Sequence, residues 1–137
     1  MMARWRIYTE NFKNVVINFN FSKEEKILAP LNVSLFSWVI ENLIKNAVDA
    51  MQGGGTIDIF MIDQKQFVYI DISDTGHGIS KSKQKTIFEP GFTTKKRGWG
   101  LGLSLTKRII ENYHNGKIFV KQSSEKGTTF RIVLKKY

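Results

Sequence analysis

The chain has 137 residues, a formal net charge of +9, 42% hydrophobic residues and no cysteine. A chain of this length holds one domain with a real core, and its composition is that of a globular protein. The lack of cysteine excludes disulfides and thiolate metal sites, and the sequence contains neither a run of ~18 apolar residues nor a signal-peptide core. We therefore expect a cytoplasmic domain that makes no membrane contact itself, whether or not a longer parent protein is anchored.

The positive charge leaves two explanations open. It is compatible with a polyanionic partner, namely nucleic acid, anionic lipid or a nucleotide phosphate, and equally with lysines that only solvate the surface. Basic residues are densest at 81–85, 95–97 and 135–136, and only the middle cluster adjoins glycines. A nucleic-acid-binding module would lose affinity steeply with salt, but no groove-reading motif supports it, and we expect no nucleic-acid partner.

Hydrophobic periodicity divides the chain into elements, with residues 1–13 interpreted as an N-terminal segment and residues 14–137 as the domain. Glycines at 53–55 end a long helix, for which Ser34 or Asn32 is a possible N-cap. The predicted strands are 15–21, 56–62, 67–73, 117–122 and 128–134, and the predicted helices are 33–52, 80–88 and 101–113. With two hairpins among these strands, we predict an α+β fold: a two-layer sandwich with three helices on one face of a mixed, mainly antiparallel sheet of about five strands.

The long helix carries two different stripes. Asn42, Lys45, Asn46 and Asp49 recur at i, i+3, i+4 and i+7, so their side chains converge on one patch. Asparagine is a poor residue for the middle of a helix because its amide competes for the backbone, so two asparagines one turn apart indicate a function. The apolar stripe that faces the core is Ile40, Leu43, Ile44, Ala47, Val48 and Met51.

A glycine- and lysine-rich loop precedes the third helix. Gly98, Gly100 and Gly102 let phosphate oxygens approach the backbone at a helix N-terminus, and the cations at 95–97 favour phosphate over a loop that is merely flexible. The P-loop pattern is absent, and Leu103 stands where the dinucleotide-binding fingerprint needs its third glycine. Eukaryotic-type protein kinase motifs are also absent.

Four segments in the same order resemble the histidine-kinase branch of the GHKL ATP-binding superfamily, which includes gyrase, the Hsp90 chaperones and MutL. Residues 41–50 (ENLIKNAVDA) resemble the N box, 74–79 (DTGHGI) the G1 box, 87–95 (IFEPGFTTK) the F box and 98–103 (GWGLGL) the G2 box. This resemblance implies the Bergerat fold, ATP and Mg²⁺ as cofactors, and phosphoryl transfer to a histidine.

The resemblance also implies roles for single residues. Asn46 would hold Mg²⁺ through its amide oxygen, with Asn42 supporting the metal and phosphates from one turn away. Asp74 would accept a hydrogen bond from the adenine amine, although a simple Asx-turn with Gly76 would also explain this aspartate. Thr128 or Thr129 would complete the adenine end. The expected catalytic group is Asn42, Lys45, Asn46 and Lys95. The remaining expected nucleotide contacts are Asp49, Gly76, Gly78, Ile79, Thr94, Lys95, Gly98, Trp99, Gly100, Leu101, Gly102 and Leu103.

Asn42 favours phosphoryl transfer over ATP hydrolysis. Hydrolysing relatives place a glutamate four residues before the metal-binding asparagine, and an amide cannot replace it as a general base. Trp99 departs from the small residue usual in the loop, and we predict that it covers the triphosphate or reports on closure of the loop. The alternatives are a stand-alone GHKL kinase or ATPase, such as an anti-sigma-factor-like serine kinase, and a regulatory module that binds nucleotide without catalysis.

Neither histidine fits the role of phosphoacceptor. His77 lies between two G1 glycines and is expected in a solvated loop, whereas His114 is expected at a helix C-terminus. The expected partners are therefore a histidine-containing dimerisation domain of the parent kinase and a downstream response regulator.

Overall fold

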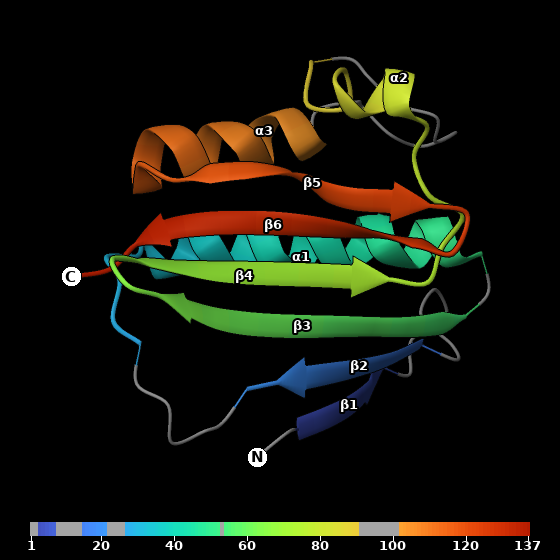
Figure 1. Ribbon diagram of the computed structural model, residues 1–137, viewed down its shortest axis with the longest axis horizontal. Helices are drawn as coiled ribbons and strands as arrows, with labels where there is room; N and C mark the ends of the chain where they lie inside the picture. The colour runs from blue at the N-terminus through green and yellow to red at the C-terminus, as the bar shows by residue number, and fades with distance from the viewer. Residues whose placement is uncertain (1–2, 8–14, 22–26, 53, 91–101) are drawn as a thin grey trace.

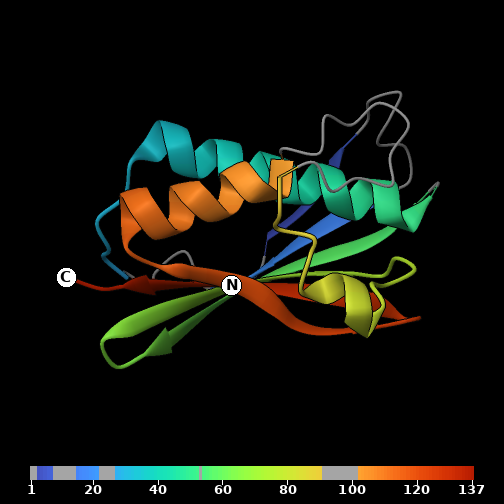
Figure 2. The ribbon, with the colours of Figure 1, turned by 90° about the horizontal axis from the view of Figure 1, so that it is seen from above.

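The computed structural model describes residues 3–7, 15–21, 27–52, 54–90 and 102–137. Its strands are β1 (Ala3–Ile7), β2 (Val15–Asn20), β3 (Gly55–Gln64), β4 (Phe67–Asp74), β5 (Lys117–Ser124) and β6 (Gly127–Lys135). Its helices are α1 (Val33–Met51), α2 (Lys81–Gln84), α3 (Gly102–Arg108) and η1 (Ile109–Tyr113), which continues α3. One sheet of order β1-β2-β3-β4-β6-β5 is covered on one face by α1 and α3 (Figures 1 and 2). The predicted two-layer α+β fold is confirmed.

The sheet is mixed, as predicted. β3 and β4 form one antiparallel hairpin and β5 and β6 another, and the antiparallel pair of β4 and β6 joins the two hairpins. β2 and β3 run parallel because the connection between them contains α1, which returns the chain to the end of the sheet where β2 begins.

β1 corrects the sequence analysis, which left residues 1–13 outside the domain. Residues 3–7 pair antiparallel with β2, from Ala3 opposite Phe19 to Ile7 opposite Val15, and so add a sixth strand to the five expected. The signal was present as an alternation of apolar and arginine residues (ARWRI), but it spans only five residues at the chain end.

The core lies between the helices and the sheet. The apolar stripe of α1 packs there as predicted, with Leu43, Ala47, Val48 and Met51 buried and Ile40 and Ile44 partly buried. The sheet contributes alternate residues of each strand, which is why these strands alternate in the sequence. Within the described residues, no helix is long and apolar enough to span a bilayer.

Hydrogen bonds join the start of α1 to the end of η1. Asn32 is the N-cap of α1, because its side chain accepts from the N–H of Leu35 at 3.0 Å. Its own N–H donates at 3.1 Å to Nε2 of His114, whose Nδ1 then donates to the carbonyl of Ile109 at 3.1 Å. The predicted position of His114 at a helix end is therefore correct, and the residue is also buried and joins two helices.

The second and third helices differ from the prediction. α2 is a single turn, because the lysines at 81, 83 and 85 provide no apolar face until Ile87 is reached. The third helix changes to a π-helix at Ile109, in which each carbonyl bonds an N–H five residues further along the chain instead of four. Beyond its end, the N–H of Gly116 donates to the carbonyl of Ile110 at 2.9 Å.

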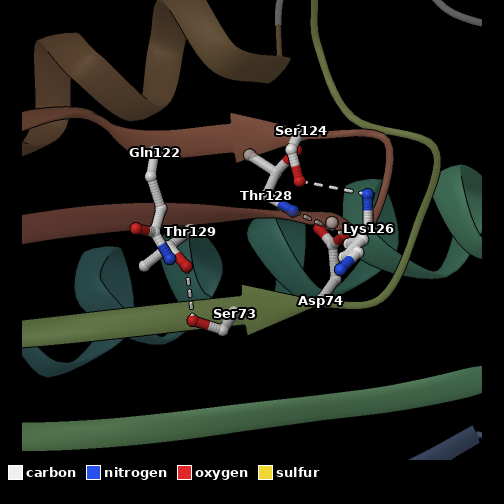
Figure 3. A pocket seen from close by; sticks show the side chains of 8 residues that line it. Ser73, Asp74, Gln122, Ser124, Lys126, Thr128 and Thr129 are labelled. Carbon is white, nitrogen blue, oxygen red and sulfur yellow. Dashed lines mark hydrogen bonds between the residues drawn. The ribbon is translucent and has the colours of Figure 1, made fainter.

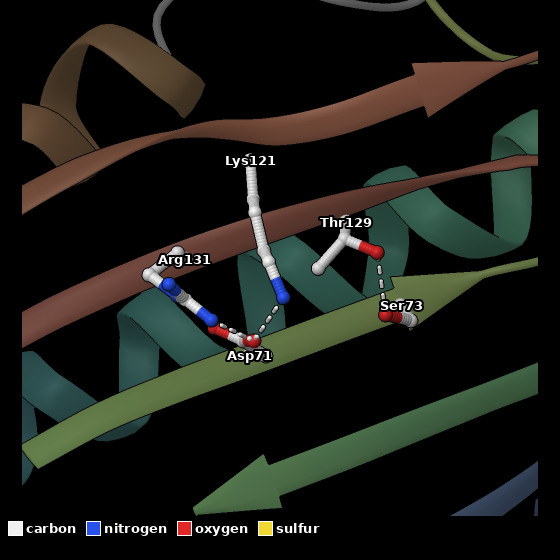
Figure 4. Close-up of polar contacts among 5 residues, drawn as sticks. All are labelled: Asp71, Ser73, Lys121, Thr129 and Arg131. Atoms are coloured by element: carbon white, nitrogen blue, oxygen red, sulfur yellow. Dashed lines mark hydrogen bonds and ion pairs between the residues drawn. The ribbon is translucent and has the colours of Figure 1, made fainter. Parts of the chain in front are cut away.

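The sheet face turned away from the helices carries a buried ion pair. Asp71 on β4 accepts two hydrogen bonds of 2.8 Å from the guanidinium of Arg131 on β6, and Lys121 lies 3.6 Å from the same carboxylate (Figure 4). The hydrogen bonds to Asp71 raise the pKa of Arg131. The guanidinium also lies over the ring of Tyr69, 4.5 Å from its centroid.

Candidate functional site

Asp74 ends β4 and is 9% exposed. Its Oδ1 accepts from the N–H of Gly76 at 2.8 Å and from the N–H of Thr128 at 3.3 Å. The Asx-turn considered from the sequence is thus present, but the same oxygen also holds β6. Burial raises the pKa of Asp74 above its usual range, and the two backbone hydrogen bonds and His77 only partly oppose this effect. Oδ2 receives no hydrogen bond within the described residues, so it remains an available acceptor.

The loop after Asp74 is attached to both layers of the fold. The N–H of His77 donates to the carbonyl of Ala50 near the end of α1 at 3.2 Å, while the His77 side chain is exposed as expected. Gly78 has φ +84°, and a Cβ there would lie 2.0 Å from the carbonyl oxygen of Ser124, so only glycine fits. The N–H of Ile79 donates to Oγ of Ser123 on β5 at 2.7 Å.

The two threonines proposed for this end of the site lie on opposite faces of the sheet. Thr128 pairs in register with Asp74, and its Oγ1 lies 2.7 Å from Oγ of Ser123. Thr129 instead bonds the hydroxyl of Ser73 at 2.6 Å (Figures 3 and 4). Thr128 is therefore the one placed beside Asp74 and the loop at 76–79.

A hollow of about 190 Å³ lies where β4 and the β5–β6 hairpin end (Figure 3). Asp74 and Thr128 border it, but Ser73, Gln122 and Thr129 line it on the sheet face turned away from α1. It is smaller than the ~300–1,000 Å³ typical of ligand pockets. We therefore do not place a nucleotide in this hollow.

The polar stripe of α1 faces α3 in part. Asn42 donates through Nδ2 to Oγ1 of the buried Thr106 at 3.0 Å. A Cβ on Gly102 would lie 2.8 Å from Oδ1 of Asn42. A larger residue at the start of α3 would therefore displace the side chain of Asn42. The amide nitrogen of Asn46 is buried one turn further on, and Lys45 and Asp49 are exposed.

The described residues bring together only part of the predicted set. Ile79 and Leu103 pack partly buried against the core, and Gly102 begins α3. Thr94, Lys95, Gly98, Trp99, Gly100 and Leu101 lie outside the described residues, so their predicted contacts stay predictions.

Two neighbours of the site were missed by sequence reasoning. Thr106 supports Asn42 and Ser123 contacts Thr128, and neither belongs to any of the four motifs. A signal for Ser123 existed: a two-residue turn at 125–126 places it directly opposite Thr128 in the hairpin. For Thr106, which lies 64 residues from Asn42, the sequence offers no such register.

Comparisons with known proteins agree on one family. Residues 32–137 match the family model described as histidine kinase-, DNA gyrase B- and HSP90-like ATPase. Sporulation kinase A of Bacillus subtilis (strain 168) is 40% identical over 122 residues, which are 89% of this chain and 20% of that protein. The chain therefore spans about a fifth of the length of this relative.

Solved structures of the same fold include a catalytic domain of histidine kinase ThkA, with a TM-score of 0.69, 35% identity and coverage of 77% of this chain and 68% of that one. Histidine kinase ThkA in complex with response regulator protein TrrA matches with a TM-score of 0.71 and 27% identity over 91% of this chain and 34% of that one.

Proposed function

Because the chain belongs to the histidine kinase-, DNA gyrase B- and HSP90-like ATPase family, we propose that it is the ATP-binding catalytic domain of a sensor histidine kinase. It binds ATP with Mg²⁺ and transfers the γ-phosphoryl group to a histidine of the parent protein's dimerisation domain, which lies outside this chain. The solved complex of ThkA with TrrA supports a response regulator as the downstream partner.

The observation that carries the proposal is the buried carboxylate of Asp74. Two backbone N–H groups fix Oδ1 at 2.8 and 3.3 Å, so Oδ2 has a defined position from which to accept a hydrogen bond. The exocyclic amine of adenine is such a donor. A base that presents an acceptor instead would leave a buried carboxylate facing a lone pair, which is costly and therefore gives specificity.

The polar stripe of α1 fits the triphosphate and its metal. Mg²⁺ prefers oxygen ligands and usually takes only one or two from the protein, with phosphates and water completing its shell. A cluster of three or more acidic, histidine or cysteine residues is therefore not needed, and the described residues contain none. The amide oxygen of Asn46 would hold Mg²⁺, which when bound neutralises charge on the phosphates. Lys45 and Asp49 flank this position on the helix surface.

The surroundings of Asn42 support transfer rather than hydrolysis. The amide nitrogen of Asn42 donates a hydrogen bond to Thr106, and its amide oxygen adjoins Gly102, so Asn42 positions the start of α3. An amide cannot remove a proton from water. Phosphoryl transfer needs chiefly positioning and charge neutralisation. Lys95 would contribute the positive charge, and the backbone at Gly100 and Gly102 the hydrogen-bond donors.

The first test is ATP affinity measured by calorimetry with and without Mg²⁺. Asp74→Asn turns the acceptor at Oδ2 into a donor, so we expect affinity to fall by roughly 30-fold or more. Asn46→Ala should remove the gain in affinity from Mg²⁺ while leaving metal-free binding. The control is Asp63→Asn in the exposed β3–β4 hairpin, which should bind like the parent. If Asp74→Asn and Asn46→Ala also bind like the parent, the site assignment is wrong.

The second test concerns the acceptor. With radiolabelled ATP and the dimerisation domain of the parent protein supplied as a separate chain, the label on that domain should be acid-labile, as phosphohistidine is. An acid-stable label would contradict the histidine kinase and favour the serine kinase alternative.

A further inference from the structure

The hydroxyl of Ser123 lies between the two segments that form the proposed base end. It accepts from the N–H of Ile79 at 2.7 Å, and it lies 2.7 Å from Oγ1 of Thr128. Ile79 follows the glycine loop and Thr128 lies beside Asp74 in the sheet register. Ser123 therefore connects the loop to β6 through a single oxygen.

The hydrogen-bond inventory of these groups restricts where each proton points. A hydroxyl has one hydrogen and two lone pairs, and the N–H of Ile79 already occupies one lone pair of Ser123. If Thr128 donated to Ser123, the hydrogen of Ser123 would have no acceptor among the described residues. If Ser123 donates to Thr128 instead, the hydrogen left without an acceptor among the described residues belongs to Thr128, which lies beside Asp74 at the proposed base end, where a bound base can accept it. The hydrogen of Thr128, which is 4% exposed, is then released toward a third group.

We infer that Ser123 is a positioning residue for adenine recognition, which turns the hydroxyl hydrogen of Thr128 toward N1 of the base. This inference rests on the proposed function. A carboxylate acceptor at Asp74 beside a fixed donor at Thr128 complements adenine, which presents an amine donor at C6 beside an acceptor at N1. Guanine presents the opposite order, with an acceptor at C6 and a donor at N1, so both positions would clash.

The side chain of Thr128 alone does not fix this preference. A hydroxyl rotates freely and serves as donor or acceptor unless a neighbour decides its role. Without Ser123, the same hydroxyl could present a lone pair to the base. Ser123 thus converts an adaptable contact into a directional one without touching the nucleotide itself.

The test compares ATP with 1-deaza-ATP, in which a C–H group replaces N1, by calorimetry at constant Mg²⁺. The parent should bind ATP about five-fold more tightly than 1-deaza-ATP, the ratio expected for one hydrogen bond. In Ser123→Ala this ratio should fall below that of the parent through weaker ATP binding, because the hydroxyl of Thr128 is no longer held as a donor, with 1-deaza-ATP bound as before. Both affinities are measured on the same variant, so a general loss of folded protein cancels in the ratio.

Two further variants bracket the result. Ser124→Ala is the matched control and should leave the ratio unchanged, because among the described residues that hydroxyl accepts only from the N–H of Lys126 in the turn, at 3.1 Å. Ser123→Thr keeps a hydroxyl and should retain the ratio. An unchanged ratio in Ser123→Ala, or equal losses for both nucleotides, overturns the inference. If Asp74→Asn binds ATP like the parent, the proposed function fails instead.

Discussion

Folding and ligand binding place opposite demands on Asp74. Burial raises the pKa of this carboxyl, so the folded protein holds its proton more tightly than the unfolded chain does. The stability that results is fully present below the unfolded pKa of about 3.9, and it is lost as the pH rises through the higher folded pKa. At neutral pH the charged carboxylate therefore reduces the stability of the domain, while remaining the acceptor that adenine recognition requires.

Asp74→Asn should separate these two effects. Its amide oxygen can still accept from Gly76 and Thr128, while the buried charge is removed. We expect the free energy of unfolding without nucleotide to rise by about 0.5–1 kcal/mol at pH 7, and the gain to disappear as the pH falls to about 4. Urea unfolding across this pH range measures the difference, with Asp63→Asn as the exposed control. A variant less stable than the parent at pH 7 would contradict this account.

At the scale of residues, the sequence predicts what local motifs contain and misses what the sheet register creates. Asp74 is found because it follows a strand and precedes two glycines. Ser123 is missed because its role depends on standing opposite Thr128 in a hairpin and on a contact with Ile79, 44 residues away. The polar stripe of α1 is visible in the sequence, but the contact of Asn42 with Thr106 exists only once α1 and α3 pack together.

At the scale of elements, the buried ion pair on β4 and β6 is a sensitive point of the sheet. The side chain of Asp71 is 4% exposed and that of Arg131 17%, so removing one partner leaves a charge largely out of water. Asp71→Ala should lower the free energy of unfolding by about 3 kcal/mol. Urea unfolding measures this loss, and Asp71→Ala combined with Arg131→Ala should recover part of it because no lone charge remains.

The matched control for this pair is Asp63→Ala. Asp63 on β3 pairs with Lys136, which follows β6, but the side chain of Asp63 is 57% exposed. An exposed pair contributes only ~0–1 kcal/mol. Equal losses for Asp71→Ala and Asp63→Ala would show that burial does not decide the strength of these pairs.

The sequence predicts the elements with long, regular patterns. Both hairpins and α1 are found because alternation or helical periodicity continues over many residues and ends at glycines. β1 is missed because its alternation is short, and η1 because a π-helix differs from an α-helix in hydrogen bonding rather than in composition. The pairing of β4 with β6 joins residues far apart in the chain and does not follow from any local pattern.

At the scale of the whole molecule, β1 protects an edge that would otherwise be open. Deleting residues 1–7 would leave β2 as the edge strand, with a row of unpaired backbone groups and apolar side chains at 15, 17 and 19. We expect the shortened protein to self-associate with increasing concentration, as measured by analytical ultracentrifugation. Its ATP affinity should stay within about two-fold of the parent because the proposed site lies on other elements.

The control for this deletion replaces Arg4 and Arg6 with threonine, which removes the charge of the strand and keeps its backbone. If that variant self-associates as strongly as the deletion, charge rather than strand pairing protects the edge. A deletion that stays monomeric would show that β2 needs no cover.

The hydrogen bond from His77 to Ala50 has a consequence for the length of nucleotide that the proposed site accepts. It ties the base end to α1 four residues after Asn46, a separation of about 6 Å along the helix axis. The helix thus sets the distance between the base and the phosphates, and this distance can change only in steps of whole residues. Inserting one residue between these positions would lengthen the span by only about 1.5 Å but turn the amide face by about 100°. Loop changes elsewhere can alter affinity, but the base-to-phosphate distance that the site measures is set by the α-helix itself.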